Sequence, residues 1–162
     1  AEENPGQAIV FCNSKRNGEL LFQGLKGVVN SLEYIHGGLE QDRRTSIFDR
    51  FKKGKIQVMV ATDVAGRGLD FSRVSHIFNY DFPGAAENYV HRTGRTGRMG
   101  REGVAISLVT GRDLVAVKRL CQEKHIQAAW DGTAPDLNQA SAQDGCRSPG
   151  SRGCYRRGSR RR

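Results

Sequence analysis

The feature that most constrains the fold of this chain is a regular alternation between short apolar runs and segments of helical periodicity. The apolar runs cover residues 8–12, 32–36, 57–62, 74–80 and 103–109. Segments with helical spacing cover residues 18–29, 41–54, 85–93 and 112–124. Runs that are apolar almost throughout are typical of strands buried on both faces of a parallel sheet. The pattern predicts a three-layer α/β domain over about residues 5–130, with a mostly parallel sheet flanked by helices.

This architecture also predicts where functional side chains should lie. Ligands bind beyond the carboxyl ends of the strands in open sheets of this kind. The first, third and fourth apolar runs are followed by residues 13–16, by residues 62–70, and by the stretch from Asp81 into residues 91–100. We therefore expect the functional site at these three places.

The charge of the chain is concentrated at its C-terminal end. Of the net charge of +9, residues 141–162 carry +6, from seven arginines and one aspartate, which leaves about +3 for residues 1–140. From about residue 131 the apolar periodicity ends, so we expect residues 131–162 to form a disordered Arg/Gly/Ser-rich tail. The basic excess favours a polyanionic partner.

Several classes of protein are disfavoured by composition. No apolar run approaches the roughly 18–20 residues that span a membrane, and no signal peptide is visible. The four cysteines form no CxxC pair, and no histidine stands at zinc-ligand spacing, so we expect no metal site. We expect a soluble, intracellular monomer without a membrane partner. The sequence does not distinguish cytoplasm, nucleus and organelle.

The most unusual stretch is "HRTGRTGRMG", residues 91–100. An arginine stands at every third position, with glycines between: Arg92, Arg95, Arg98, Gly94, Gly97 and Gly100. Such a stretch is either a loose cationic loop or the wall of a shaped pocket. Its place between a short helix and an apolar strand favours the pocket, because glycines let the backbone turn while arginines grip phosphate oxygens in pairs.

Two further stretches suggest contacts with phosphate or ribose. In "ATDVAGRGLD", residues 61–70, small residues at a strand end let phosphate approach the backbone, and Asp70 can accept a hydrogen bond from a ribose hydroxyl. In residues 36–51, Gln41 and Arg44 share one face at a predicted helix start, where donors suit a phosphate backbone. Taken singly, these stretches also fit an ordinary strand-to-helix loop and an exposed polar helix face.

Taken together, the motifs resemble the second RecA-like domain of the DEAD-box RNA helicases, over about residues 5–125. The matching stretches, in order, are "AIVFCNSK", "HGG" followed by Gln41 and Arg44, "ATDVAGRGLD", "FNYDFP" and "HRTGRTGR". One departure is Thr93, where the family usually has an apolar residue. Neither a GxxxxGK[ST] phosphate loop nor a DEAD sequence is present, so the resemblance implies an N-terminal RecA-like partner domain elsewhere in the protein.

The resemblance implies a role for each matching residue. Arg95 and Arg98 would face the γ-phosphate of ATP, one of them as an arginine finger, with Gly68 and Asp70 beside the nucleotide and Mg²⁺ held mainly by the missing domain. His91 and Arg92 would contact that domain and couple the sites. The RNA sugar-phosphate backbone would be held by a set from three loops: Asn13, Ser14, Gln41, Arg44, Thr62, Asp63 and Gly66.

The implied function is half of an ATP-dependent RNA helicase, inactive as an ATPase when isolated. Two other interpretations remain open at this point. One is a non-catalytic RNA-binding module that acts mainly through the basic tail. The other is a related motor that acts on DNA, which the pattern "HRTGRTGR" disfavours.

Overall fold

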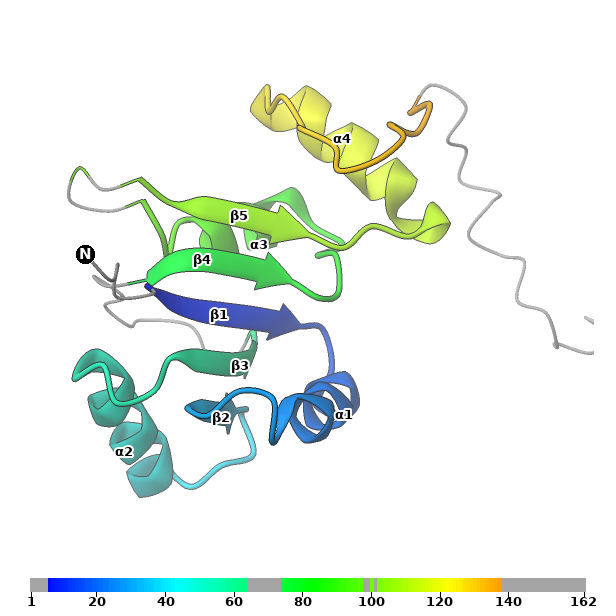
Figure 1. The fold of residues 1–162 in the computed structure, drawn as a ribbon. Helices are drawn as coiled ribbons and strands as arrows, with labels where there is room; N and C mark the ends of the chain where they lie inside the picture. The colour runs from blue at the N-terminus through cyan, green and yellow to red at the C-terminus, as the bar shows by residue number, and fades with distance from the viewer. Residues whose placement is uncertain (1–5, 64–73, 98–99, 101, 138–162) are drawn as a thin grey trace, which may run out of the picture.

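The structure, a computed structural model, describes residues 6–63, 74–97, 100 and 102–137. Strands and helices follow one another along the chain in the order that the sequence predicts (Figure 1). The strands are β1 (Gln7–Cys12), β2 (Leu32–Ile35), β3 (Val58–Thr62), β4 (Val74–Asn79) and β5 (Val104–Ser107). The helices are α1 (Lys15–Leu25), α2 (Gln41–Lys52), α3 (Ala86–Thr93) and α4 (Leu114–Lys124), the last preceded by a 3₁₀ turn over Gly111–Asp113.

The five strands form one sheet in the order β2-β3-β1-β4-β5, and every neighbouring pair is parallel. The central strand β1 pairs with β3 and with β4, so Val10 stands opposite Val60 on one side and Phe78 on the other. All carboxyl ends therefore meet at one edge (Figure 1). The predicted α/β class with a helix-flanked parallel sheet is confirmed.

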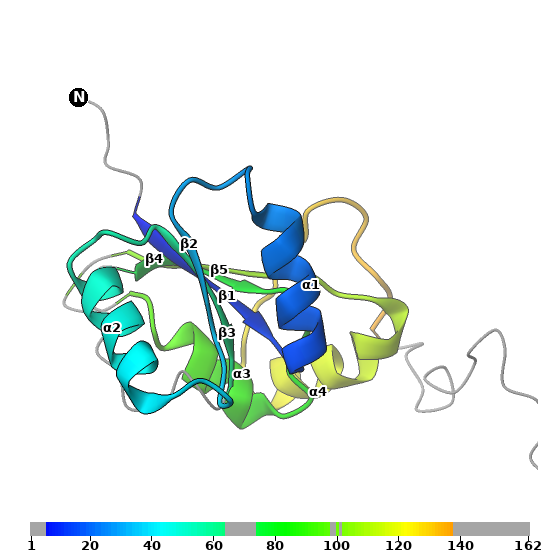
Figure 2. The same cartoon turned by 90° about the horizontal axis from the view of Figure 1, so that it is seen from below.

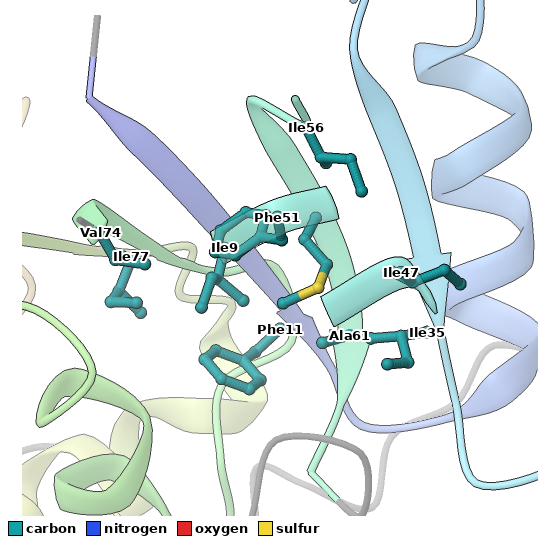
Figure 3. Close-up of a cluster of buried hydrophobic side chains, with 10 residues drawn as sticks. Ile9, Phe11, Ile35, Ile47, Phe51, Ile56, Ala61, Val74 and Ile77 are labelled. Carbon is teal, nitrogen blue, oxygen red and sulfur yellow. The ribbon is translucent and has the colours of Figure 1, made fainter. Parts of the chain in front are cut away.

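Alternation along the strands divides the core between the two faces of the sheet. On one face, Ile9 and Phe11 of β1 join Ile47 and Phe51 of α2 in a buried cluster (Figure 3). On the other face, Val10 and Cys12 lie in a second cluster, against which α1 packs its apolar side chains, Leu21, Phe22 and Leu25. Helices α1 and α2 thus cover opposite faces of the sheet (Figure 2).

Helix α1 ends earlier than the helical spacing of residues 18–29 predicts. It begins at Lys15 because Ser14 is an N-cap whose hydroxyl accepts the backbone N–H of Asn17 at 3.1 Å. It ends at Leu25, and Gly27 follows with a φ of 96°. That left-handed backbone suits glycine and cannot continue a helix, which is why the predicted extension to residue 29 is wrong.

The last described segment continues to pack beyond α4. Trp130 and Leu137 lie against a cluster built on Phe82, Val117 and Leu120. Packing therefore extends to Leu137, and residues 138–162 of the predicted tail lie outside the described residues. None of the helices in the described ranges is long and apolar enough to cross a membrane.

Candidate functional site at the carboxyl edge of the sheet

Arg92, near the end of α3, is the central side chain of this edge and is 1% exposed. Its Nε and Nη2 donate to the two carboxylate oxygens of Asp63, at 2.6 and 2.7 Å. Nη2 also donates to the Asn13 side-chain oxygen at 2.7 Å. Nη1 donates to the side-chain oxygen of Asn79 and to the carbonyl of Asp81, at 3.2 and 2.8 Å. All five N–H donors of the guanidinium are therefore used inside the domain.

The same network continues through Asp81, which follows β4. The Asp81 carboxylate accepts the backbone N–H of Asn13 at 2.9 Å and the side-chain amide of Asn17 at 3.0 Å. The Asn13 amide nitrogen donates to the carbonyl of Phe82 at 3.0 Å. The ends of β1, β3 and β4 are thus tied to α1 and α3 by side chains whose polar atoms are satisfied.

Apolar side chains lie next to the Arg92 network. The guanidinium carbon of Arg92 stands 5.3 Å from the centre of the Phe11 ring, a cation–π geometry. The next residue, Cys12, lies in the cluster on the other face of the sheet. Its burial, helped by the negative charge of Asp81 and opposed by the positive charge of Arg92, raises its thiol pKa to about 12. Cys12 is therefore a neutral core residue at physiological pH and has no nucleophilic character.

After Arg92, the chain forms a tight turn. Gly97 and Gly100 have φ values of 67° and 74°, so these two positions require glycine. Gly94 has an ordinary φ of −65°, but a Cβ there would stand 2.9 Å from the carbonyl of Val90. Thr96 donates to the carbonyl of Val74 at 2.7 Å, which pins the turn to the sheet. This part of the segment is a constrained wall and not a loose loop.

Arg95 and His91 lie on this wall. Arg95 is half-buried and its Nε donates to the carbonyl of His91 at 3.1 Å, while His91 itself is exposed. Thr93, which departs from the family pattern, donates its hydroxyl to the carbonyl of Tyr89 at 2.9 Å, so that the helix accommodates it. Arg92 is buried and exposes no donor to a partner domain. Coupling of the RNA and ATP sites through Arg92 would therefore be indirect, and it remains a prediction.

The residues predicted to hold RNA differ in their exposure and in whether their side chains are already bonded within the domain. Gln41 and Arg44 lie in the first turn of α2, whose N-cap Glu40 makes no side-chain capping bond. Ser14 is exposed and caps α1. By contrast, Thr62 is 6% exposed, and both polar atoms of the Asn13 side chain are bonded within the domain. Asp63 is paired with Arg92 and is partly exposed.

Four predicted site residues lie outside the described residues: Gly66, Gly68, Asp70 and Arg98. Two residues of the matching stretch "FNYDFP" have central places in the network, although no individual role was predicted for them. Asp81 and Asn79 each bond to another segment of the network. Their place at the carboxyl end of β4 was the signal that could have identified them as site residues.

Comparison with known proteins agrees with this geometry. Residues 1–100 match the family model described as Helicase conserved C-terminal domain. The ATP-dependent RNA helicase CshA of Listeria monocytogenes is 52% identical over 138 residues, which are 85% of this chain and 26% of that protein. The chain thus spans about a quarter of the length of this relative.

Two solved structures carry the same fold. Dbp5 of S. cerevisiae bound to RNA and ADP BeF3 superposes with a TM-score of 0.69 at 33% identity, over 74% of this chain and 32% of that one. Mss116p helicase domain 2 bound to an RNA duplex gives a TM-score of 0.69 at 28% identity, over 90% and 59%. Together with the Arg92 network at the carboxyl edge of a RecA-like sheet, these matches show that the chain belongs to the DEAD-box RNA helicases and contains their helicase C-terminal domain.

Proposed function

We propose that this domain binds the sugar-phosphate backbone of RNA and completes the ATP site of a two-domain helicase. RNA would lie along the N-terminal ends of α1 and α2 and the loop after β3, with contacts from the predicted set: Asn13, Ser14, Gln41, Arg44, Thr62, Asp63 and Gly66. Backbone contacts of this kind carry no base information, so we expect little sequence preference.

The observation that carries the proposal is the Arg92 network. It joins Asp63, next to the predicted RNA loop, to α3, from which the chain continues to Arg95 three positions later. A displacement of the loop after β3 by RNA would therefore change the position of α3 and of Arg95. His91, exposed on α3 beside Arg92, is the side chain we assign to contact with the N-terminal RecA-like domain.

The donor set of the wall suits a nucleotide triphosphate. Arg95 and Arg98 would neutralise the negative charge that gathers on the transferring phosphoryl oxygens, a contribution of roughly 10³–10⁵ in rate for a positioned arginine. Gly68 and Asp70 would lie beside the ribose. Among the described residues, no group of three acidic, histidine or cysteine side chains is placed to hold a metal ion. Mg²⁺ would be held mainly by the N-terminal RecA-like domain.

The proposal is tested in the protein joined to its N-terminal domain. Arg98→Ala should lower RNA-stimulated ATP turnover by at least about a hundredfold, while RNA affinity changes much less. Arg119→Ala is the matched control, because Arg119 lies on α4 and pairs with its helical neighbour Glu123. If Arg98→Ala lowered ATP turnover and RNA affinity equally, Arg98 would be only an RNA contact.

The isolated chain of 162 residues should show no measurable ATP turnover, because it has no phosphate loop. Robust RNA-stimulated hydrolysis by this chain alone would contradict the two-domain proposal.

A further inference from the structure

Strand β5 is the outermost strand of the sheet, and its apolar side chains are exposed (Figure 1). Val104, Ile106 and Leu108, the last just beyond the strand, are 47%, 42% and 55% exposed. Ile106 stands beside Phe78, and Phe78 beside Val10, so this row of side chains points to the face of the sheet that α1 covers. The cluster under α1 includes Phe78 but none of the three, which we call the β5 row.

The outer backbone of β5 is open as well. The N–H of Leu108 donates to the carbonyl of Asn79 at 3.0 Å, so Ile106 and Leu108 direct their backbone groups toward β4. Ala105 and Ser107 therefore direct their N–H and C=O groups away from the sheet. Among the residues that the structure describes, β5 has a neighbouring strand on one side only. Helix α4 lies beside α3 and packs on Phe82 (Figure 2).

This edge has none of the features that usually keep two sheets from joining. Edge strands are commonly protected by charged side chains, by proline or by a β-bulge. The sequence of β5 is VAIS, and its register with β4 has no shift. An apolar row next to free backbone groups is the surface to which a further strand can be added.

The β5 row is complementary to itself when two copies of the strand run antiparallel. With a twofold axis at Ile106, Ala105 of each copy stands opposite Ser107 of the other, and each such pair exchanges both of its backbone hydrogen bonds. Ile106 then faces Ile106, and Val104 faces Leu108. These are the positions without direct hydrogen bonds, where opposite Cα atoms are about 4.5 Å apart and side chains are closest.

We infer that β5 is a dimer interface, in which two copies of this chain pair their β5 strands antiparallel about a twofold axis at Ile106. The two sheets then form one continuous sheet. Antiparallel pairing directs their carboxyl edges in opposite directions, so the interface does not depend on the proposed RNA function. The monomer expected from the sequence is the form at low concentration.

The size of the interface sets the strength of the dimer. Three side chains that each expose about half of their surface form a patch of roughly 200–300 Å² per copy. This is well below the roughly 800 Å² per partner of a stable interface, and the added backbone pairing is short. We therefore expect a weak dimer, with a dissociation constant of about 10–100 µM.

The first test is analytical ultracentrifugation of the full chain, treated with nuclease and kept reduced, from about 1 to 300 µM. The average mass should rise from monomer to dimer over this range. Each copy has a net charge of +9, so added salt should strengthen the dimer by screening the repulsion. A monomer at every concentration would overturn the inference. Association that weakens with salt would also overturn it, because residual RNA would then bridge the copies.

The second test places a charge in the β5 row. Ile106→Lys sets two ammonium groups opposite each other at the axis and should raise the dissociation constant at least about tenfold. Leu20→Lys is the matched control, because Leu20 is an exposed apolar residue of α1, and it should leave the constant unchanged. Ile106→Thr keeps a β-branched residue and should weaken the dimer even if the lysine variant fails to fold. A dimer that persists in Ile106→Thr and in a folded Ile106→Lys would place the interface elsewhere and sink the proposal.

The third test reads the register through disulfide formation, in a background with Cys121, Cys146 and Cys154 changed to serine. Ile106→Cys brings two thiols together across the axis, within the Cα separation of about 4.4–6.8 Å that a disulfide spans. Val104→Cys leaves its two thiols on opposite sides of the axis, beyond this reach. Mild oxidation with diamide should therefore crosslink the Ile106→Cys protein and not the Val104→Cys protein. Equal crosslinking of both, or of neither, would contradict the pairing.

Discussion

The guanidinium of Arg92 and the carboxylate of Asp63 form a two-pronged ion pair, with N–O distances of 2.6 and 2.7 Å, in which the arginine is 1% and the carboxylate 32% exposed. Such a pair, with every remaining arginine donor also bonded, fixes geometry more than it adds stability. Its effect is to hold α3 at a defined place relative to the end of β3. The turn at residues 94–97 is thereby positioned by Asp63, which belongs to the segment predicted to touch RNA.

Removal of this arginine should destabilise the domain strongly. Arg92→Ala leaves Asp63 without its partner and Asn79 without its donor, and we expect the free energy of unfolding to fall by about 3–5 kcal/mol. Arg92→Lys keeps the charge but cannot reproduce the planar fork, so it should recover only part of this loss. Urea unfolding of the isolated chain measures both. Arg119→Ala, which removes an exposed pair, should leave the midpoint unchanged, and an equally small effect of Arg92→Ala would contradict the role of the network.

The contact between α1 and β2 can be tested with two glycines of one helix. Gly18→Ala places a Cβ 2.7 Å from the buried Tyr34 ring, so overpacking should lower the free energy of unfolding by about 1–3 kcal/mol. Gly24→Ala meets no atom within 4 Å and should raise it by about 0.5–1 kcal/mol, because alanine favours the helix. Thermal unfolding monitored by circular dichroism gives both changes. If both variants changed the free energy of unfolding in the same direction, helix propensity and not the Tyr34 contact would determine the effect of Gly18→Ala.

The buried thiol of Cys12 should make stability depend on pH in the alkaline range. Its pKa rises from 9.0 to about 12 on folding, so between these values the unfolded chain has lost a proton that the native protein keeps. Stability is therefore full below about pH 9 and falls as pH rises toward 12. Burial raises the pKa of Tyr34 as well, which adds a loss of the same sign. Cys12→Ala should flatten the decline of the unfolding free energy with pH, and parallel curves for the two proteins would rule out this contribution.

The layers and the order of elements were predictable because burial on both faces leaves a direct signature in the strands. Val58 to Thr62 and Ile9 to Cys12 are apolar almost continuously, and that pattern alone indicates a sheet covered on both sides. The helix ends were less predictable. The apolar residues Val28 and Val29 continue the helical spacing of α1, but the backbone turns at Gly27, and Val28 is 79% exposed.

The site was predictable in place but not in its connections. The rule for carboxyl ends of strands identified the segments after β1, β3 and β4. The sequence could not show that Arg92 points inward while Arg95 does not, because both occur in one repeat of Arg and Gly. Their difference arises from tertiary partners, Asp63, Asn79 and Asn13, that are 29, 13 and 79 residues away.

On the predicted RNA surface, Arg44→Ala should weaken binding about equally for RNAs of different sequence. A phosphate contact releases counterions and reads no base, so the slope of log K against log salt should fall by about 0.7. Lys52→Ala, at the other end of α2, is the matched control because it removes the same charge. Fluorescence anisotropy with two unrelated single-stranded RNAs at several salt concentrations is sufficient. A loss confined to one sequence would mean that Arg44 contacts a base.

The last prediction concerns residues 141–162, which lie outside the described residues and carry seven arginines and one aspartate. Seven positive charges within 22 residues attract a polyanion at low salt, whereas residues 1–140 have a net charge of only about +3 and half of an RNA site. Tyr155, flanked by Arg156 and Arg157, can stack on an unpaired base, a contact worth about 1–3 kcal/mol. Deletion of residues 141–162 should therefore remove most of the binding of the isolated chain to single-stranded RNA at low ionic strength, and the lost part should be strongly salt-sensitive. The unfolding midpoint should not change, because every fully buried residue in the described part of the chain precedes residue 121. Filter binding of the two proteins at two salt concentrations measures the difference. Unchanged affinity after deletion would assign the RNA binding of this chain to the surface of α1 and α2 and leave the basic segment without a part in it.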